Sequence, residues 1–133
     1  MKKNQPLCQV LVVEPDKLLA STYRRAMEES GITSEWQSSA QDAIDSIDKS
    51  KPKVIILELQ LHVHNGIEFL HELRSYPDWQ MIPTILLTLV PEHELGLSDD
   101  SKKQLNIVGY YYKPHTSLEQ LVEFVNEELK RSA

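Results

Sequence analysis

Five polar side chains suited to phosphoryl chemistry each follow an apolar run in this 133-residue chain. Glu14 and Asp16 come after the first run, Glu58 and Thr88 follow two later runs, and Lys113 follows the last. Carboxylates hold divalent cations, and a hydroxyl and an ammonium group bind phosphoryl oxygens. If the runs are strands of one parallel sheet, their carboxyl ends meet in a single crevice, which is where open α/β sheets bind ligands.

Each of these residues also has an ordinary structural explanation. Asp16 is suited to cap the N-terminus of the helix that follows it, and we expect this role ahead of metal binding. Thr88 can be the last β-branched residue of a strand, and Lys113 a surface lysine whose stem lies on apolar neighbours. No residue is specific by itself, so the prediction depends on their combination.

The elements that would position these residues are visible in the hydrophobic pattern. Apolar, β-branched runs alternate with segments of helical period, which predicts an α/β domain with a parallel sheet covered on both faces. The run at 32–36 is more polar than the others and indicates an edge strand. The predicted strands are Val10–Val13, 32–36, Val54–Leu57, 83–88 and Ile107–Tyr112.

Capping residues predict where the intervening helices begin and end. The stretch 91–104 should hold the fourth helix, but Gly96 interrupts it and Ser98 is typical of a new N-cap. Five β/α units in one domain, spanning residues 1–133, account for the chain. The expected caps are Ser39, Asn65 with Glu68, and Thr116 with Glu119 at N-termini, and Gly31 at the end of the first helix.

Composition excludes several classes of function. The net charge of −6 argues against general affinity for nucleic acid. No apolar run approaches the ~20 residues that a membrane span needs, and the residues before Leu7 do not form a signal peptide. Cys8 is the only cysteine, so no internal disulfide can form, and we expect a buried thiol in a cytoplasmic protein. His62 and His64 lack a third ligand and are expected in a solvated loop, not in a zinc site.

Five segments form a specific combination: VLVVEPD at 10–16, VIILE at 54–58, Asn65-Gly66, IPTILLT at 82–88 and GYYYKP at 109–114. Through these segments the chain resembles, from about residue 7 to residue 129, the response-regulator receiver (CheY-like) domains of two-component signalling. The resemblance implies a five-stranded doubly wound parallel sheet in the order 2-1-3-4-5, the flavodoxin-like receiver fold. It also implies a role in phosphorelay signal transduction.

In such domains, an aspartate after the third strand accepts a phosphoryl group from a histidine kinase, and an acidic pair after the first strand holds Mg²⁺. A threonine and a lysine bind the phosphoryl oxygens, and an aromatic residue on the fifth strand moves with the threonine. Carried over to this chain, the resemblance makes Thr88 the switch hydroxyl, Tyr110 the switch aromatic and Lys113 the lysine.

The departures from this pattern are informative. Glu58 occupies the phosphoacceptor position, and its extra methylene moves the carboxylate about 1.3 Å further from the backbone. Pro15 replaces a metal-binding acid, which leaves Glu14 and Asp16 as weak metal candidates. Leu89 stands where a small residue admits the phosphoryl group, and we expect it to crowd the entrance. Mg²⁺ demands octahedral oxygen ligands, and misplacement on this scale can cost about a hundredfold in rate.

We therefore expect a pseudo-receiver that is not an enzyme and needs no cofactor. Our hypothesis is that Glu58 pairs with Lys113, with Thr88 taking part, and holds one conformation without phosphorylation. A signalling protein, either a histidine kinase or a downstream output protein, would read that conformation. It would bind on the face of the fourth helix, fifth strand and fifth helix, where a homodimer is also expected. The alternative for Lys113 and Thr88 is a role in packing alone.

Three other functions remain to be weighed. A phosphorylatable receiver would accept a phosphoryl group on Glu58 with Mg²⁺. A phosphohydrolase of the haloacid-dehalogenase type would need an aspartate nucleophile, which the segment at 14–16 does not supply in the required place. Nucleotide binding is disfavoured because none of the four glycines forms a phosphate-binding cluster after a strand. The last predicted helix is followed by no DNA-binding unit, so a stand-alone receiver and a part of a larger regulator both stay open.

Overall fold

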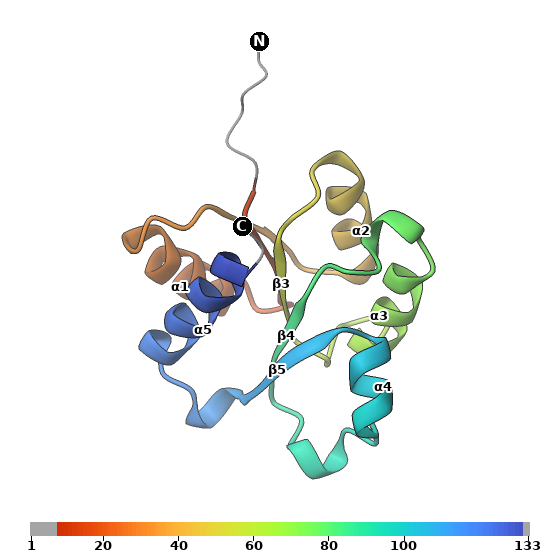
Figure 1. The fold of residues 1–133 in the computed structure, drawn as a ribbon. Coiled ribbons are helices and arrows are strands. Elements are labelled where there is room, and N and C mark those ends of the chain that lie inside the picture. Colours follow the sequence, from red (N-terminus) through yellow and green to blue (C-terminus); the bar gives the residue numbers. More distant parts are fainter. Residues whose placement is uncertain (1–7, 132–133) are drawn as a thin grey trace.

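Five parallel strands form the central sheet in the order β2-β1-β3-β4-β5 (Figure 1). The computed structural model describes residues 8–131. The order confirms the doubly wound, flavodoxin-like sheet expected from the resemblance. The strands are β1 (Val10–Val13), β2 (Ser34–Gln37), β3 (Val54–Leu57), β4 (Thr84–Thr88) and β5 (Ile107–Tyr112).

Burial follows the position of each strand in the sheet. Every residue of β1, β3 and β4 is buried, as the β-branched and leucine runs of central parallel strands require. The more polar β2 lies at an edge and begins at Ser34, two residues later than the predicted 32–36. The reason is that Ile32 belongs to the turn after the first helix, where its N–H donates to the carbonyl of Met27 at 2.9 Å.

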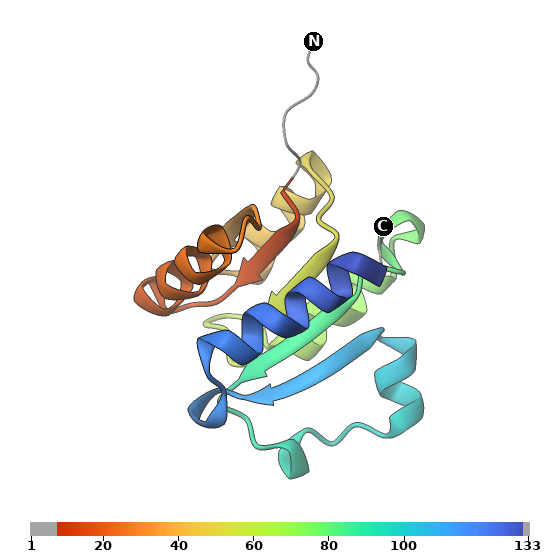
Figure 2. The ribbon, with the colours of Figure 1, turned by 60° about the vertical axis from the view of Figure 1, so that its left-hand side comes forward.

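Helices cover both faces of the sheet. Figures 1 and 2 show α1 and α5 on one face and α2, α3 and α4 on the other. Separate apolar clusters lie under the two layers. Within residues 8–131, no helix has the length and apolarity that crossing a membrane requires. The bounds are α1 (Lys17–Glu29), α2 (Ala40–Lys49), α3 (Gly66–Arg74), α4 (Asp99–Gln104) and α5 (Leu118–Arg131), with 3₁₀ turns at Pro77–Trp79, Glu92–Glu94 and Lys113–His115.

Most of the predicted helix caps are present. Asp16 caps α1, Ser39 caps α2, and Asn65 forms with Glu68 a reciprocal capping box at the start of α3. Gly31, just beyond α1, has φ +80°, the left-handed conformation that favours glycine after a helix.

The capping box predicted for Thr116 and Glu119 is wrong by one position. Ser117 and Gln120 exchange the two capping hydrogen bonds, at 2.8 and 3.1 Å. The Thr116 hydroxyl instead donates to the carbonyl of Tyr112 at 2.8 Å, which closes the turn before α5. The fourth helical stretch is short, as its poor pattern predicted: α4 has six residues, and Ser98 caps it.

Arg74, at the C-terminus of α3, connects segments that are distant in sequence. Its guanidinium donates to the carbonyls of Trp79, Ile82 and Leu105, each at 2.8 Å, and to the Thr84 hydroxyl at 3.0 Å. Burial lowers the pKa of this guanidinium to about 10, so it stays charged at neutral pH. Arg74 therefore fixes the start of β4 against the turn that leads into β5.

Candidate functional site

Strand register brings the polar residues together at the carboxyl edge of the sheet. Val13 of β1 pairs with Leu57 of β3, so the residues that follow them, Glu14 and Glu58, lie side by side. Thr88 of β4 pairs with Tyr112 of β5, so Lys113 comes one residue beyond Thr88. Figure 2 shows the strands pointing to this common edge. The predicted convergence of these side chains is therefore present.

The Glu58 carboxylate is 2% exposed and accepts hydrogen bonds from four donors. One oxygen, Oε1, lies 2.7 Å from the Lys113 ammonium nitrogen and 3.1 Å from the backbone nitrogen of Leu89. The other, Oε2, accepts from the backbone N–H of Gln60 at 3.0 Å and from the Thr88 hydroxyl. Both carboxylate oxygens are thus fully engaged within the chain.

Lys113 bridges two buried carboxylates. Its ammonium nitrogen lies 2.8 Å from Glu14 Oε1 as well as 2.7 Å from Glu58 Oε1, and its side chain is 10% exposed. Burial by itself lowers the pKa of Lys113, but the hydrogen bonds and charges of Glu14 and Glu58 outweigh it and raise the pKa above its ordinary value. The ammonium is therefore held in its charged form between the two acids.

Glu14 is fixed by its own neighbours. Its Oε2 accepts from the backbone N–H of Asp16 at 3.0 Å, and its carbonyl accepts from the Trp36 indole at 2.7 Å. Glu14 is 2% exposed, so the ion pair with Lys113 is shielded from water. The sequence predicts Glu14 only as a weak metal candidate and gives no signal for its pairing with Lys113.

These residues do not fit a divalent cation. Pro15 supplies no side-chain oxygen, and the exposed Asp16 uses Oδ1 to accept from two N–H groups at the start of α1. Glu14 and Glu58 share the Lys113 ammonium in the place between them. Within residues 8–131, no three His, Cys, Asp or Glu side chains are grouped to hold a metal. The role of Asp16 as an N-cap is confirmed.

A line of contacts runs from Glu58 to the predicted switch aromatic. Thr88 donates its hydroxyl to Glu58 and accepts from the N–H of Val90 at 3.1 Å. The Val90 carbonyl accepts from the Tyr110 hydroxyl at 2.7 Å, and the Tyr110 ring packs against the core beneath α2 and α3. The start of the β4–α4 loop is therefore held from both sides.

Leu89 acts at the site through its backbone. Its side chain is 48% exposed, and its N–H is the group that reaches Glu58. The sequence predicts that the Leu89 side chain narrows access to Glu58. The contact that is present is instead a hydrogen bond from the Leu89 backbone. Backbone donors cannot be recognised from residue type, which is why the sequence did not reveal Leu89 and Gln60 as part of the site.

The β3–α3 loop brings the Gln60 N–H to Glu58. Gly66 lies so close to this loop that an added Cβ would stand 2.8 Å from the Leu59 Cα, and its N–H donates to the Leu59 carbonyl at 2.8 Å. His62 and His64 are exposed in the same loop, as expected. Gly66 thus permits the start of α3 to lie against Leu59, next to Gln60, whose N–H donates to Glu58.

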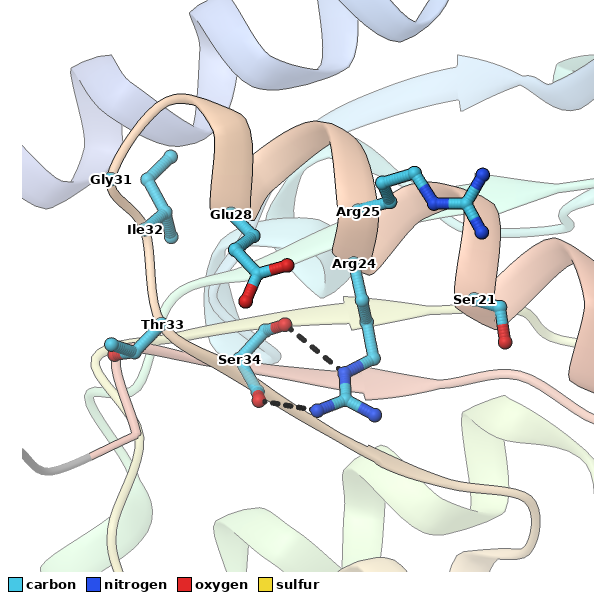
Figure 3. Close-up of a pocket in the computed structure, with 8 residues that line it drawn as sticks. All are labelled: Ser21, Arg24, Arg25, Glu28, Gly31, Ile32, Thr33 and Ser34. Atoms are coloured by element: carbon cyan, nitrogen blue, oxygen red, sulfur yellow. Dashed lines mark hydrogen bonds between the residues drawn. The ribbon is translucent and has the colours of Figure 1, made fainter.

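A surface hollow lies away from this site. It has a volume of about 640 Å³ and is formed by α1 and the segment 31–34 (Figure 3). Arg24 spans it, with Nε 3.2 Å from the Ser34 hydroxyl and a terminal nitrogen 3.0 Å from the Ser34 carbonyl. Because this contact covers the outer edge of β2, we assign the hollow no part in the chemistry of the site.

Comparison with solved structures supports the fold. The chain is 25% identical to the receiver domain of the Francisella response regulator 1452, with a TM-score of 0.76 over 93% of this chain and 98% of that chain. It is 27% identical to the signal receiver domain of a putative Luxo repressor protein from Vibrio parahaemolyticus, with a TM-score of 0.75 over 92% and 90% of the two chains.

Sequence comparison indicates the same class of protein. The chain is 27% identical over 127 residues to the response regulator MprA of Mycolicibacterium vanbaalenii, which covers 93% of this chain and 51% of that protein. It spans about half the length of the curated relatives that it matches. The model of the response regulator receiver domain matches residues 10–126. Together with the sheet order and the residues at its carboxyl edge, this match shows that the chain belongs to the response-regulator receiver family of two-component signalling.

Proposed function

We propose that this receiver signals by protein–protein interaction and without phosphorylation, with Glu58 acting as a permanent substitute for a phosphorylated residue. The observation that carries the proposal is the set of four donors on one buried carboxylate: the Lys113 ammonium, the Thr88 hydroxyl and the N–H groups of Gln60 and Leu89. Charge-assisted hydrogen bonds of this kind are among the strongest in proteins.

Phosphoryl transfer needs donors that neutralise the charge on the transferred group. In this site the donors already serve Glu58, and a phosphoryl group bound there would have to displace the carboxylate that is meant to attack it. The lysine ammonium stands between the two acids that would otherwise hold a cation. Both arguments favour an inert acceptor position.

The contacts from Thr88 through Val90 to Tyr110 supply a route from the site to the surface. They hold the β4–α4 loop and the Tyr110 ring in one arrangement, beside α4 and β5. We propose that a histidine kinase or a downstream output protein reads this arrangement on the face of α4, β5 and α5. The same face is where we propose that two copies would pair.

Intact mass spectrometry after incubation with acetyl phosphate and Mg²⁺ tests the proposal. We expect no added phosphate on the parent chain, whereas a receiver with an aspartate acceptor, treated in parallel, gains one phosphate. A gain of one phosphate mass that disappears in Glu58→Gln would contradict the proposal and favour a phosphorylatable receiver that uses Mg²⁺.

A partner-binding comparison tests the other half of the proposal. The variants are Glu58→Gln, which removes the charge that Lys113 pairs with, and Glu72→Gln, which changes an exposed glutamate on α3. The binding partner is a cognate kinase or output protein, measured by calorimetry. We expect weaker binding for Glu58→Gln alone, and equal affinity for all three proteins would contradict the role of Glu58.

A further inference from the structure

A small groove lies between the edge strand β5 and α5, on the opposite face of the sheet from Tyr110. Its volume is about 260 Å³, and it is lined by Tyr111, Gln120, Glu123, Phe124 and Glu127. Tyr111 comes from β5, and the other four residues come from α5. The α5 positions follow a helical spacing that places them on one side of the helix.

Two aromatic rings form the apolar part of this groove. Tyr111 and Phe124 meet edge to face with their ring centroids 5.1 Å apart. Gly109 makes this arrangement possible, because a Cβ at that position would lie 2.8 Å from two atoms of the Phe124 ring. The Phe124 ring is therefore packed tightly against β5 at Gly109 and forms part of the groove wall together with Tyr111.

The polar part of the groove is negatively charged. Glu123 and Glu127 are exposed and one helical turn apart, and neither makes an ion pair in the part of the chain that the structure describes. Burial, followed by the negative charges of Glu127 and Glu128, raises the pKa of the Tyr111 phenol. This groove thus combines an aromatic surface with two carboxylates that have no cationic partner among residues 8–131.

We propose that this groove binds an arginine side chain of a protein partner. A guanidinium group stacks on aromatic rings and donates hydrogen bonds to carboxylates in the same plane, which a compact ammonium group does less well. β5 is the last strand of the sheet, so one of its edges is left unpaired by the other strands. A partner segment lying along that edge would reach the groove with a side chain.

The inference rests on the proposed function only in placing a protein partner beside β5. It does not depend on the state of Glu58, which lies at the carboxyl edge of the sheet and outside the groove. The two ideas therefore fail separately.

The experiment is an amide NMR titration of the full chain with the peptide acetyl-Gly-Arg-Gly-amide. The control peptide carries citrulline, which has nearly the same shape as arginine and no charge. We expect saturable shifts at the groove residues with arginine and none with citrulline. In Glu127→Gln, binding should weaken several-fold, while Glu72→Gln, which changes a distant exposed glutamate on α3, should bind as the parent does.

Three results would overturn the inference: no arginine shifts in the parent, equal shifts with citrulline, or equal weakening by Glu72→Gln. The last would indicate a general effect of net charge. We expect Glu58→Gln to keep the arginine shifts. If phosphorylation of the parent disproved the proposed function, these shifts would still stand, and their absence would leave the proposed function untouched.

Discussion

At the residue scale, one methylene group changes what the end of β3 can do. A glutamate carboxylate reaches about 1.3 Å further than that of an aspartate. At position 58 this reach brings the carboxylate to donors on two other segments: Thr88 and Leu89 at the end of β4, and Lys113 after β5. We expect an aspartate at this position to end short of these donors unless they move.

Removing either partner of the buried ion pair should destabilise the fold. Lys113→Ala leaves the buried carboxylates of Glu14 and Glu58 without the cation that they share, so we expect a loss of about 3–5 kcal/mol in the free energy of unfolding. Glu58→Gln keeps a carbonyl acceptor and should cost about 1–3 kcal/mol. Urea unfolding measures both, with the exposed Glu72→Gln expected within about 0.5 kcal/mol of the parent. A change near zero in the free energy of unfolding of Lys113→Ala would rule out a structural role for the ion pairs of Lys113.

The raised pKa of Lys113 predicts how stability depends on pH. A raised pKa means that the folded chain binds the proton more tightly than the unfolded chain, whose lysine has a pKa near 10.5. The stability that the ammonium contributes is fully present below pH 10.5 and is lost as the pH rises through the higher folded-state pKa. The measurement is urea unfolding of the parent and of Lys113→Met from pH 8 to pH 11.5. The difference in the free energy of unfolding between the parent and Lys113→Met should stay constant up to about pH 10.5 and become smaller above it. A difference that already becomes smaller between pH 8 and pH 9 would contradict a raised pKa of Lys113.

At the scale of elements, the β4–α4 loop depends on contacts from two strands. Tyr110→Phe removes the hydroxyl that donates to the Val90 carbonyl, while keeping the ring in the core. We expect faster amide hydrogen exchange at Leu89 and Val90 and a loss of about 0.5–1.5 kcal/mol in stability. Tyr76→Phe, at an exposed tyrosine, is the control. Unchanged exchange at both amides would show that the hydroxyl does not hold the loop.

How much of the fold the sequence could predict varies between elements for physical reasons. The strands β1, β3 and β4 stand out because central parallel strands are buried on both faces and therefore apolar throughout. The start of β2 is less predictable, since Ile32 is buried whether it lies in the ladder or in the turn before it. The register shift in the β4–β5 pairing, near Ile85, leaves no signature in residue type.

The same distinction applies to the site. The side chains of Glu58, Thr88 and Lys113 could be predicted because strand order places the strand ends together, whereas Tyr110, within β5, was predicted only from the resemblance to receiver domains. The backbone donors of Gln60 and Leu89 could not, because every residue except proline carries an N–H and only the loop conformation aims it. Arg74 was missed because all its hydrogen-bond acceptors are neutral: three backbone carbonyls and the Thr84 hydroxyl.

At the scale of the whole molecule, we expect the protein not to bind Mg²⁺, because the Lys113 ammonium already bridges Glu14 and Glu58. The indole of Trp36 donates to the Glu14 carbonyl, so its fluorescence reports on the carboxyl edge of the sheet. We expect no saturable change in that fluorescence as Mg²⁺ rises through the millimolar range, measured in Trp79→Phe so that a single tryptophan remains. In Lys113→Ala, if it folds, the two freed carboxylates should respond to Mg²⁺. A saturable response in the parent would restore the metal-dependent alternative.

The four hydrogen bonds on Glu58 also bear on how long a signal lasts. An acyl phosphate on a receiver is hydrolysed while the protein persists, so such a signal decays with the bond. A glutamate side chain cannot be erased in this way. Under the proposed function, the signalling conformation lasts as long as the polypeptide itself. A cell would then change the signal by changing how much of the chain is made, degraded or bound by its partner.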